Sequence, residues 1–310
     1  MHNCLVGSEM CIRDRKFTVT LSLIFSINHV YADREAFEST YVPLAPEKIV
    51  IQNASIYDGD GGEFFETDVL VEDGKIIAIG KDLPFSNEFR VIDATGKWVT
   101  PGIIDIHSHM GVYPAPGVRT SSDGNEATSP VTADVWAEHS IWVQDPQYAL
   151  ALTGGVTAFH ILPGSANLIG GRGVTVKNLQ RVTINSMKFP DAPHSLKMAC
   201  GENPKRVYGN RGQAPSTRMG NAAGYRKSWI QAEGYLRRLN EYEEKSDEAK
   251  ELEYAPTRDL EMETLAGVLK GEILVHNHCY RADEMATMID IAKEFNYKIT
   301  AFHHGVEAYK

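Results

Sequence analysis

The segment from Trp98 to Gly111, WVTPGIIDIHSHMG, carries two histidines one residue apart at the end of a short apolar run. The run from Ile103 to Ile106 is β-branched and follows Pro101-Gly102, a pattern that predicts a buried strand entered from a turn. Side chains at positions i and i+2 of a strand share one face, so His107 and His109 project together. Such a pair can bind zinc or a similar ion, or can serve only as hydrogen-bonding groups.

The composition is that of a globular chain with enough apolar material for a large core. Of its 310 residues, 43% are hydrophobic and 23% are charged. The net charge of -10, with no basic stripe, argues against nucleic acid as a partner.

The N-terminus is set apart from the rest of the chain. Residues 1–15, MHNCLVGSEMCIRDR, resemble a translated sequencing-adaptor read-through and are excluded from the fold. Residues 16–32, KFTVTLSLIFSINHVYA, combine a basic residue, an apolar stretch and small residues, which is typical of a secretory signal. A buried strand or helix is the alternative. The stretch is too short for a membrane span, which needs about 20 apolar residues. We expect a bacterial protein that is periplasmic or secreted, without stable membrane insertion.

Three further stretches predict strands. Ile49 to Gly80 alternates apolar and polar residues around DGDGG and EDGK, a hairpin pattern. Ala149 to Lys177 predicts a helix end, a Gly-Gly turn and two strands, VTAFHIL and GVTVK. Its glycine-rich loop lacks the spacing of a phosphate-binding fingerprint. Ser195 to Ala199 is a short apolar strand with Lys197 in its middle.

A lysine inside a barrel strand is costly unless it is paired or chemically modified. Alternatively, the side chain of Lys197 extends to the surface and keeps its ammonium group in water. Cys200 and Cys279 lie close to this strand and to the histidines described next. A bridge or a ligand role is open for them, but we expect buried free thiols that act as small hydrophobes.

Two more histidine pairs follow predicted strands. GEILVHNHCYRADEM contains His276 and His278, with a helix expected from Ala282. YKITAFHHGVEAYK ends a strand in His303-His304. Adjacent strand residues face opposite ways, so only one of these two is expected to point inward. Between these strands and Lys197, residues 226–254 are rich in charge at helix-neighbour spacing and predict a solvated helical excursion.

In their order, these motifs resemble the amidohydrolase superfamily over residues 47–310, where a PGxIDxHxH strand supplies the first two metal ligands. The resemblance implies an α/β fold with two parts. Residues 47–98 would form part of a small β-sandwich. Residues 99–310 would form a metal-dependent-hydrolase TIM-like (β/α)8 barrel, incomplete here at about six strands.

The resemblance also implies a ligand set. A fourth-strand lysine, carboxylated and bridging two ions in many relatives, corresponds to Lys197, with Glu202 as the alternative bridge. The family patterns HAYT and EHG favour His278 over His276 and His304 over His303. His160 falls where the family places no ligand and is read as structural or substrate-facing. The expected metal ligands are His107, His109, Lys197, His278 and His304.

The implied cofactor is one or two divalent metal ions, with zinc expected. The implied activity is hydrolysis of a carbon–nitrogen bond in an amide, a cyclic amide or a small peptide. The resemblance is to the branch with imidazolonepropionases and metal-dependent prolidase-like dipeptidases, and Lys197 favours the dipeptidase side. The catalytic aspartate follows the eighth strand in the family and is expected beyond Lys310, so we expect an inactive, truncated fragment. The alternative is a non-catalytic metal- or ligand-binding protein on a decayed barrel.

The expected partner is a small-molecule or small-peptide substrate, and a homo-oligomer is left open. Arg172, Arg211 and Arg218 lie in loop-like stretches. An arginine there could bind a substrate carboxylate, or could remain solvated.

Overall fold

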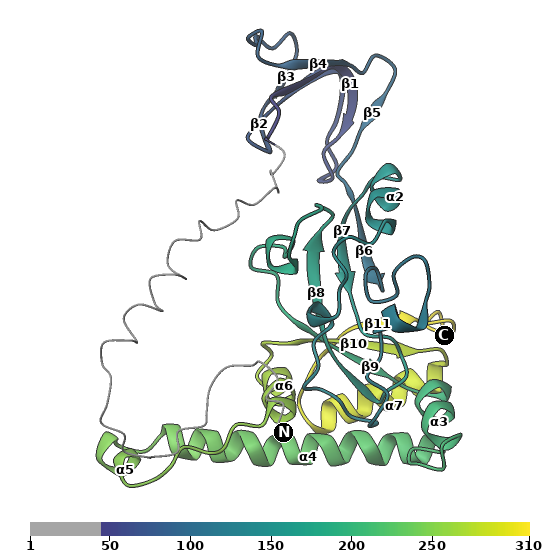
Figure 1. Ribbon diagram of the computed structural model, residues 1–310, viewed down its shortest axis with the longest axis vertical. Helices are drawn as coiled ribbons and strands as arrows, with labels where there is room; N and C mark the ends of the chain where they lie inside the picture. Colours follow the sequence, from purple (N-terminus) through teal and green to yellow (C-terminus); the bar gives the residue numbers. More distant parts are fainter. Residues whose placement is uncertain (1–44) are drawn as a thin grey trace, which may run out of the picture. The chain divides into compact units, whose positions relative to one another are not determined.

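The computed structural model describes residues 45–310, so the adaptor-like segment 1–15 and the signal-like segment 16–32 lie outside the described residues (Figure 1). The chain divides into two compact units between Val99 and Thr100. Over the described range, no helix has both the length and the apolar character needed to cross a membrane.

Residues 45–99 form a mixed five-stranded sheet in the order β3-β2-β1-β4, with β5 also paired to β1. The predicted hairpins are confirmed, because β1–β2 and β2–β3 are antiparallel pairs. Asp73 and Gly74 connect β2 to β3 with positive φ angles of 50° and 72°, which suits the tight turn predicted at EDGK. The strands are β1 Ile49–Tyr57, β2 Glu63–Glu72, β3 Lys75–Gly80, β4 Arg90–Asp93 and β5 Trp98–Val99.

The expected β-sandwich is not confirmed in this unit. The strands of residues 45–99 belong to one sheet, whose small core contains Ala54, Ile56 and Val69. On β3, Ile76 and Ile77 remain 63% and 52% exposed. Alternating polarity predicts that a strand has an apolar face, but it does not specify which second layer covers that face.

Residues 100–310 contain a six-stranded sheet in the order β11-β10-β9-β8-β7-β6. The sheet is curved like a barrel, because its two outermost strands approach one another: His107 Nδ1 of β6 lies 2.8 Å from His303 Nδ1 of β11. The predicted strands are confirmed. Their bounds are β6 Ile103–Ser108, β7 Val156–Ile161, β8 Ile169–Lys177, β9 Ser195–Ala199, β10 Leu274–Cys279 and β11 Ile299–His304.

One strand departs from the regular (β/α)8 pattern. β8 runs antiparallel to both of its neighbours, β7 and β9, whereas the pairs β6–β7, β9–β10 and β10–β11 are parallel. Only residues 162–168 separate β7 from β8. A parallel return needs a crossover of a dozen or more residues, so this short loop can only reverse the chain.

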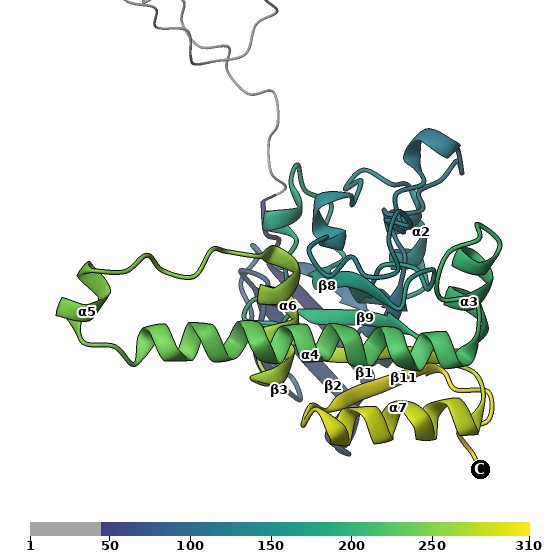
Figure 2. The same ribbon diagram turned by 90° about the horizontal axis from the view of Figure 1, so that it is seen from below.

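Helices cover the outer face of β9 and β10. In this layer α4, the 26-residue helix, packs with α6 and α7 (Figures 1 and 2). Tyr225, Trp229 and Ala232 of α4 recur at helical spacing and are buried in the core, so the predicted excursion is a helix with one packed face rather than a fully solvated one. The helices are α2 Gln147–Thr153, α3 Glu202–Gly209, α4 Arg218–Glu243, α5 Asp247–Glu251, α6 Leu260–Leu269 and α7 Ala282–Glu294, with 3-10 turns at Arg119–Ser121, Ala137–His139 and Ile184–Ser186.

The alternation along β9 decides which residues face the inside of the curved sheet. Leu196 and Met198 point outward into the core shared with α4, α6 and α7. Ser195 and Lys197, one residue out of phase with them, therefore lie on the inner face. This register places a lysine in the interior beside the histidine-bearing strands, since His276 of β10 is the direct neighbour of Lys197.

Candidate metal centre

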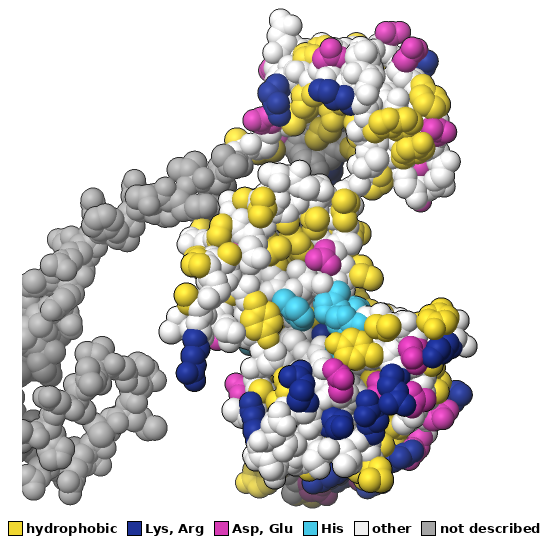
Figure 3. Space-filling model, turned by 90° about the vertical axis from the view of Figure 1, so that its right-hand side faces the viewer, with side chains coloured by type: hydrophobic (Ala, Val, Ile, Leu, Met, Phe, Trp, Pro, Cys, Tyr) yellow, Lys and Arg dark blue, Asp and Glu magenta, His cyan; other side chains and the backbone are white. Residues whose placement is uncertain are grey.

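The four histidines expected to bind metal lie together at one end of the curved sheet. The ring centroids of His107 and His109 are 5.1 Å apart, those of His107 and His304 are 5.0 Å apart, and those of His278 and His304 are 4.4 Å apart. Figure 3 shows histidine side chains gathered in one patch on a face of the molecule. Strands β6, β10 and β11 therefore bring the predicted histidine ligands into one cluster.

Lys197 is fully buried beneath this cluster. Its Nζ donates to the carbonyl oxygen of Pro163 at 3.0 Å, and burial lowers the pKa of Lys197 to about 7. In a large fraction of the molecules the Lys197 amine is therefore uncharged near neutral pH. An uncharged amine is a nucleophile.

The histidines of the cluster are neutral at physiological pH. Burial is the main cause, and it lowers the pKa of His278 and of His303 to about 3; the positive charge of Lys197 acts in the same direction. The pKa values of His107, His109 and His304 are lowered too, again chiefly by burial. A neutral imidazole has a free lone pair on one nitrogen, which metal binding requires.

The hydrogen bonds of two of these rings show which nitrogen carries the proton. His109 Nδ1 lies 2.8 Å from the carbonyl oxygen of Leu162. A carbonyl can only accept, so Nδ1 carries the proton and Nε2 keeps its lone pair. His278 Nε2 lies 3.3 Å from Asn203 Nδ2, a contact that no sequence motif indicated. The amide nitrogen donates, so Nε2 accepts and the neutral ring carries its proton on Nδ1, which is buried without a hydrogen-bond partner within the described residues.

The cluster is not a finished coordination site. Over residues 45–310, no three His, Cys, Asp or Glu side chains are already arranged to hold a metal ion. The residues nevertheless fit a divalent ion in donor type and in proximity, and the hydrogen bond of His109 Nδ1 leaves His109 Nε2 free to bind an ion.

The expectation that only one of His303 and His304 points inward is wrong. The His303 ring lies 4.4 Å from that of His107, and the His304 ring lies 5.0 Å from it. His304 ends β11 with a positive φ of 68°, which turns its side chain away from the alternation of a regular strand. Both histidines therefore reach the cluster.

His160 is buried and bonds to side chains of the neighbouring strands. Its Nδ1 is 2.9 Å from Thr175 Oγ1 and its Nε2 is 2.8 Å from Ser195 Oγ. With both nitrogens engaged by hydroxyl groups of neighbouring strands, His160 matches the structural reading.

The remaining predicted site residues lie elsewhere. Glu202 is exposed on the first turn of α3. Each predicted arginine has another partner: Arg172 Nε donates to Thr264 Oγ1 at 2.8 Å, Arg211 donates to the carbonyl oxygen of Ala127, and Arg218 Nε donates to Glu284 Oε1 at 2.6 Å. The structure thus gathers Lys197 with the histidines, but it does not gather Glu202 or these arginines.

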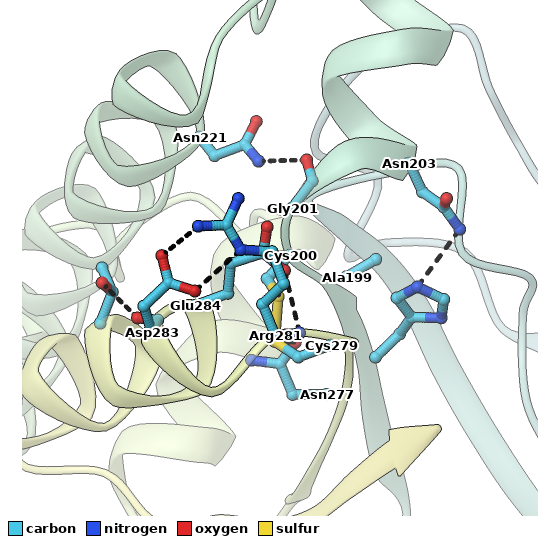
Figure 4. Close-up of a disulfide and its surroundings, with 12 residues drawn as sticks. Ala199, Cys200, Gly201, Asn203, Asn221, Asn277, Cys279, Arg281, Asp283 and Glu284 are labelled. Atoms are coloured by element: carbon cyan, nitrogen blue, oxygen red, sulfur yellow. Dashed lines mark hydrogen bonds and ion pairs between the residues drawn. A yellow bond between two sulfur atoms is a disulfide. The ribbon is translucent and has the colours of Figure 1, made fainter. Parts of the chain in front are cut away.

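Cys200 and Cys279 form a disulfide, so the expectation of free thiols is wrong (Figure 4). Their Cα atoms are 5.2 Å apart, and both residues are buried. β9 and β10 are parallel neighbours, and Cys200 directly follows β9 while Cys279 is the last residue of β10. The bridge therefore ties together the two strands that carry Lys197 and His278.

Removing this bridge is expected to destabilise the protein. The cysteines are 79 residues apart in sequence, and a native disulfide that closes a loop of this size contributes about 2–5 kcal/mol to the free energy of unfolding. The double substitution Cys200→Ser with Cys279→Ser should lower the urea midpoint, and added reductant should then have no further effect. An unchanged midpoint would contradict the prediction, as would labelling of Cys200 and Cys279 by a thiol reagent in the oxidised, unfolded wild type.

Acid is expected to destabilise the metal-free protein. Burial lowers the pKa of His160 and of His278 from 6.5 to about 3. Between these pH values the unfolded chain binds protons that the folded chain does not. The contribution of these two histidines to the free energy of unfolding is therefore fully present above pH 6.5. It declines as the pH falls toward 3, by up to about 1.4 kcal/mol per pH unit for each histidine.

Urea unfolding at pH 8, 6 and 5 measures this dependence. His160→Gln should flatten the decline, whereas His139→Gln, a change at an exposed histidine, should leave it as in the wild type. Equal midpoints at pH 8 and pH 5 would show that the buried histidines are protonated alike in the folded and unfolded chains.

No family model matches the chain, but comparison with known proteins finds relatives that are named as amidohydrolases or dihydroorotases. "Amidohydrolase tasK" of Hapsidospora irregularis is 37% identical over 269 residues, which cover 81% of this chain and 27% of that protein. The crystal structure of an amidohydrolase from Thermotoga maritima MSB8 superimposes with a TM-score of 0.76 and 39% identity, over 84% of this chain and 66% of that one. A dihydroorotase of Lactobacillus helveticus is 46% identical over 74 residues, 24% of this chain and 16% of that protein.

The chain thus spans 27% of the length of the curated relative that it matches over most of its own length. The likeness in sequence and the likeness in fold are both to proteins named amidohydrolase. Together with the histidine-bearing strand ends, they support membership of the amidohydrolase superfamily.

Proposed function

We propose that the protein is a metal-dependent hydrolase of a carbon–nitrogen bond in an amide, a cyclic amide or a small peptide. The observation that carries this proposal is the convergence of His107, His109, His278 and His304 over the buried Lys197. Similarity to proteins named amidohydrolase and dihydroorotase supports the class of bond.

In this proposal the four histidines hold one or two divalent ions. Nitrogen donors in a buried site favour zinc. When bound, such an ion lowers the pKa of water to about 7 and polarises the carbonyl group to be cleaved. His109 would contribute its Nε2, because the carbonyl of Leu162 holds the proton on Nδ1.

Lys197 would complete the site as a carbamate. Its neutral Nζ attacks carbon dioxide, a new N–C bond forms, and one proton leaves for solvent, so the side chain becomes an anion. The lowered pKa of Lys197 supports this reaction near neutral pH. Glu202, the alternative bridge, is exposed on α3, which favours Lys197. A bridging lysine in turn favours the dipeptidase-like side of the superfamily over the imidazolonepropionase side.

A cavity of about 560 Å³ that could hold a substrate borders Pro163, which contacts Lys197, although no candidate ligand lines the cavity itself. Pro163, whose carbonyl oxygen accepts from Lys197 Nζ, lines this cavity together with Trp136 and His139. The volume is in the range of sites for small organic ligands. We infer that a small molecule or small peptide reaches the cluster from this side.

Two further properties belong to the proposal. Ile104 and Ile106 on one face of the outer strand β6 are 61% and 62% exposed, and β6 pairs with β7 alone within the described residues, which supports further elements of the same protein packing against this strand. The general-base aspartate expected from the family would come with them.

The disulfide between Cys200 and Cys279 supports export to an oxidising compartment, as the signal-like segment predicts.

A hydrolysis screen tests the function. The full-length protein, extended through its native downstream sequence, is incubated with dipeptides, N-acyl amino acids and cyclic amides. We expect turnover that a chelator abolishes and added zinc restores. Binding of metal without turnover of any member of the panel would favour the alternative, a non-catalytic metal- or ligand-binding protein.

A further inference from the structure

We propose that His303 is a positioning residue that orients the candidate ligand His107, and that His276 in turn orients His303. The proposal rests on the metal centre described above. His107 Nδ1 lies 2.8 Å from His303 Nδ1, and His303 Nε2 lies 2.8 Å from His276 Nδ1. These contacts link β6, β10 and β11 through one row of three imidazoles.

The row has a single consistent set of proton positions when His107 binds metal through Nε2. His107 then carries its proton on Nδ1 and donates it to His303 Nδ1. His303, as a neutral ring, carries its own proton on Nε2 and donates to His276 Nδ1. Each ring thereby fixes the tautomer of the next, and a ligand whose second nitrogen is held in this way binds metal in a fixed orientation.

The row is held firmly at its far end. His276 and His303 stack with centroids 5.0 Å apart, and His276 packs against His160 at 4.5 Å. Both nitrogens of His160 are engaged by hydroxyl groups, those of Thr175 and Ser195. His303 is only 5% exposed, so water competes little for its hydrogen bonds.

This arrangement separates the roles of the neighbouring histidines. Both nitrogens of His303 are engaged by other imidazoles, which leaves no lone pair for an ion. The His304 ring lies 4.4 Å from that of His278 and 5.0 Å from that of His107, between two candidate ligands. We therefore assign ligation to His304 and positioning to His303.

The test compares two substitutions of His303 in the full chain. His303→Phe keeps an aromatic ring but removes both nitrogens, whereas His303→Asn keeps an acceptor near the position of Nδ1. Zinc affinity is measured by competition with a chelator, and the visible spectrum of the cobalt-loaded protein reports the set of ligands. His194→Phe, the same change at a histidine outside both the cluster and the proposed substrate cavity, is the control.

We expect His303→Phe to weaken zinc binding by about 10–100-fold, the usual effect of losing a group that orients a ligand. His303→Asn should recover most of the affinity, and the cobalt spectrum of both variants should keep the wild-type band intensities. His276→Phe should weaken zinc binding less than His303→Phe does, and it serves as the test if His303→Phe does not fold.

Two results would overturn the proposal. Wild-type zinc affinity in folded His303→Phe, or in His276→Phe when the former does not fold, would show that the row does not orient His107. A cobalt spectrum altered in both His303 variants as it is in His304→Ala would make His303 a ligand. A wild-type protein that binds no metal would instead reject the proposed function itself.

Discussion

Replacing both His107 and His109 by alanine is expected to remove nearly all metal from the purified protein. The two rings come from one strand end, and the apolar residues of β6 cannot replace them as donors. Changing a residue that merely orients a ligand costs about 10–100-fold in affinity, so the loss of two ligands should exceed that. Elemental analysis of metal per chain, after dialysis against a weak chelator, measures the effect.

A matched control is needed because removing two half-buried rings also alters packing. The double substitution His139→Ala with His194→Ala removes the same number of imidazoles from outside the cluster and should leave the metal content unchanged. Circular dichroism checks that both double variants are folded. Wild-type metal content in a folded variant lacking His107 and His109 would remove the basis for the proposed centre.

Lys197→Ala is expected to abolish occupancy by two ions and to lower kcat of the full-length enzyme by about 10²–10³-fold. A catalytic ion stabilises charge in the transition state by several kcal/mol, and each 1.4 kcal/mol corresponds to a factor of ten in rate. A short carboxylic acid such as propionate, added in excess, should restore part of the activity, because it can occupy the space of the lost carbamate.

Glu202→Ala is the matched control for this variant. Glu202 lies five residues further along the chain and is exposed, so its removal should leave metal content and turnover as in the wild type. Two fully occupied sites in Lys197→Ala, together with loss of one ion in Glu202→Ala, would transfer the bridging role to Glu202.

The strands could be predicted from sequence because they depend on local pattern, whereas the choice of Lys197, His278 and His304 as candidate ligands rested on the resemblance to a family. The β-branched run before His107 and the apolar residues around Lys197 predicted β6 and β9, and the structure has strands at both positions. The register of β9 followed from the period of two, which separates Lys197 from Leu196 and Met198.

The features that could not be predicted depend on contacts between distant residues. The direction of β8 is set by the short loop before it, and the disulfide depends on the parallel pairing of β9 with β10. His303 and His304 were expected to face opposite ways because a regular strand alternates, but the positive φ of His304 ends that regularity. Asn203 beside His278 belongs to no motif, and only the fold brings the two together.

The measurement that tests the central claim most directly is X-ray diffraction from crystals of the zinc-loaded protein at wavelengths on either side of the zinc absorption edge. We predict an anomalous peak bonded to nitrogen atoms of His107 and His109 at about 2.0–2.1 Å, with His278, His304 and a carbamate on Lys197 among its neighbours. Fully loaded crystals with no anomalous peak between these histidines, or with zinc held by other residues, would contradict the account.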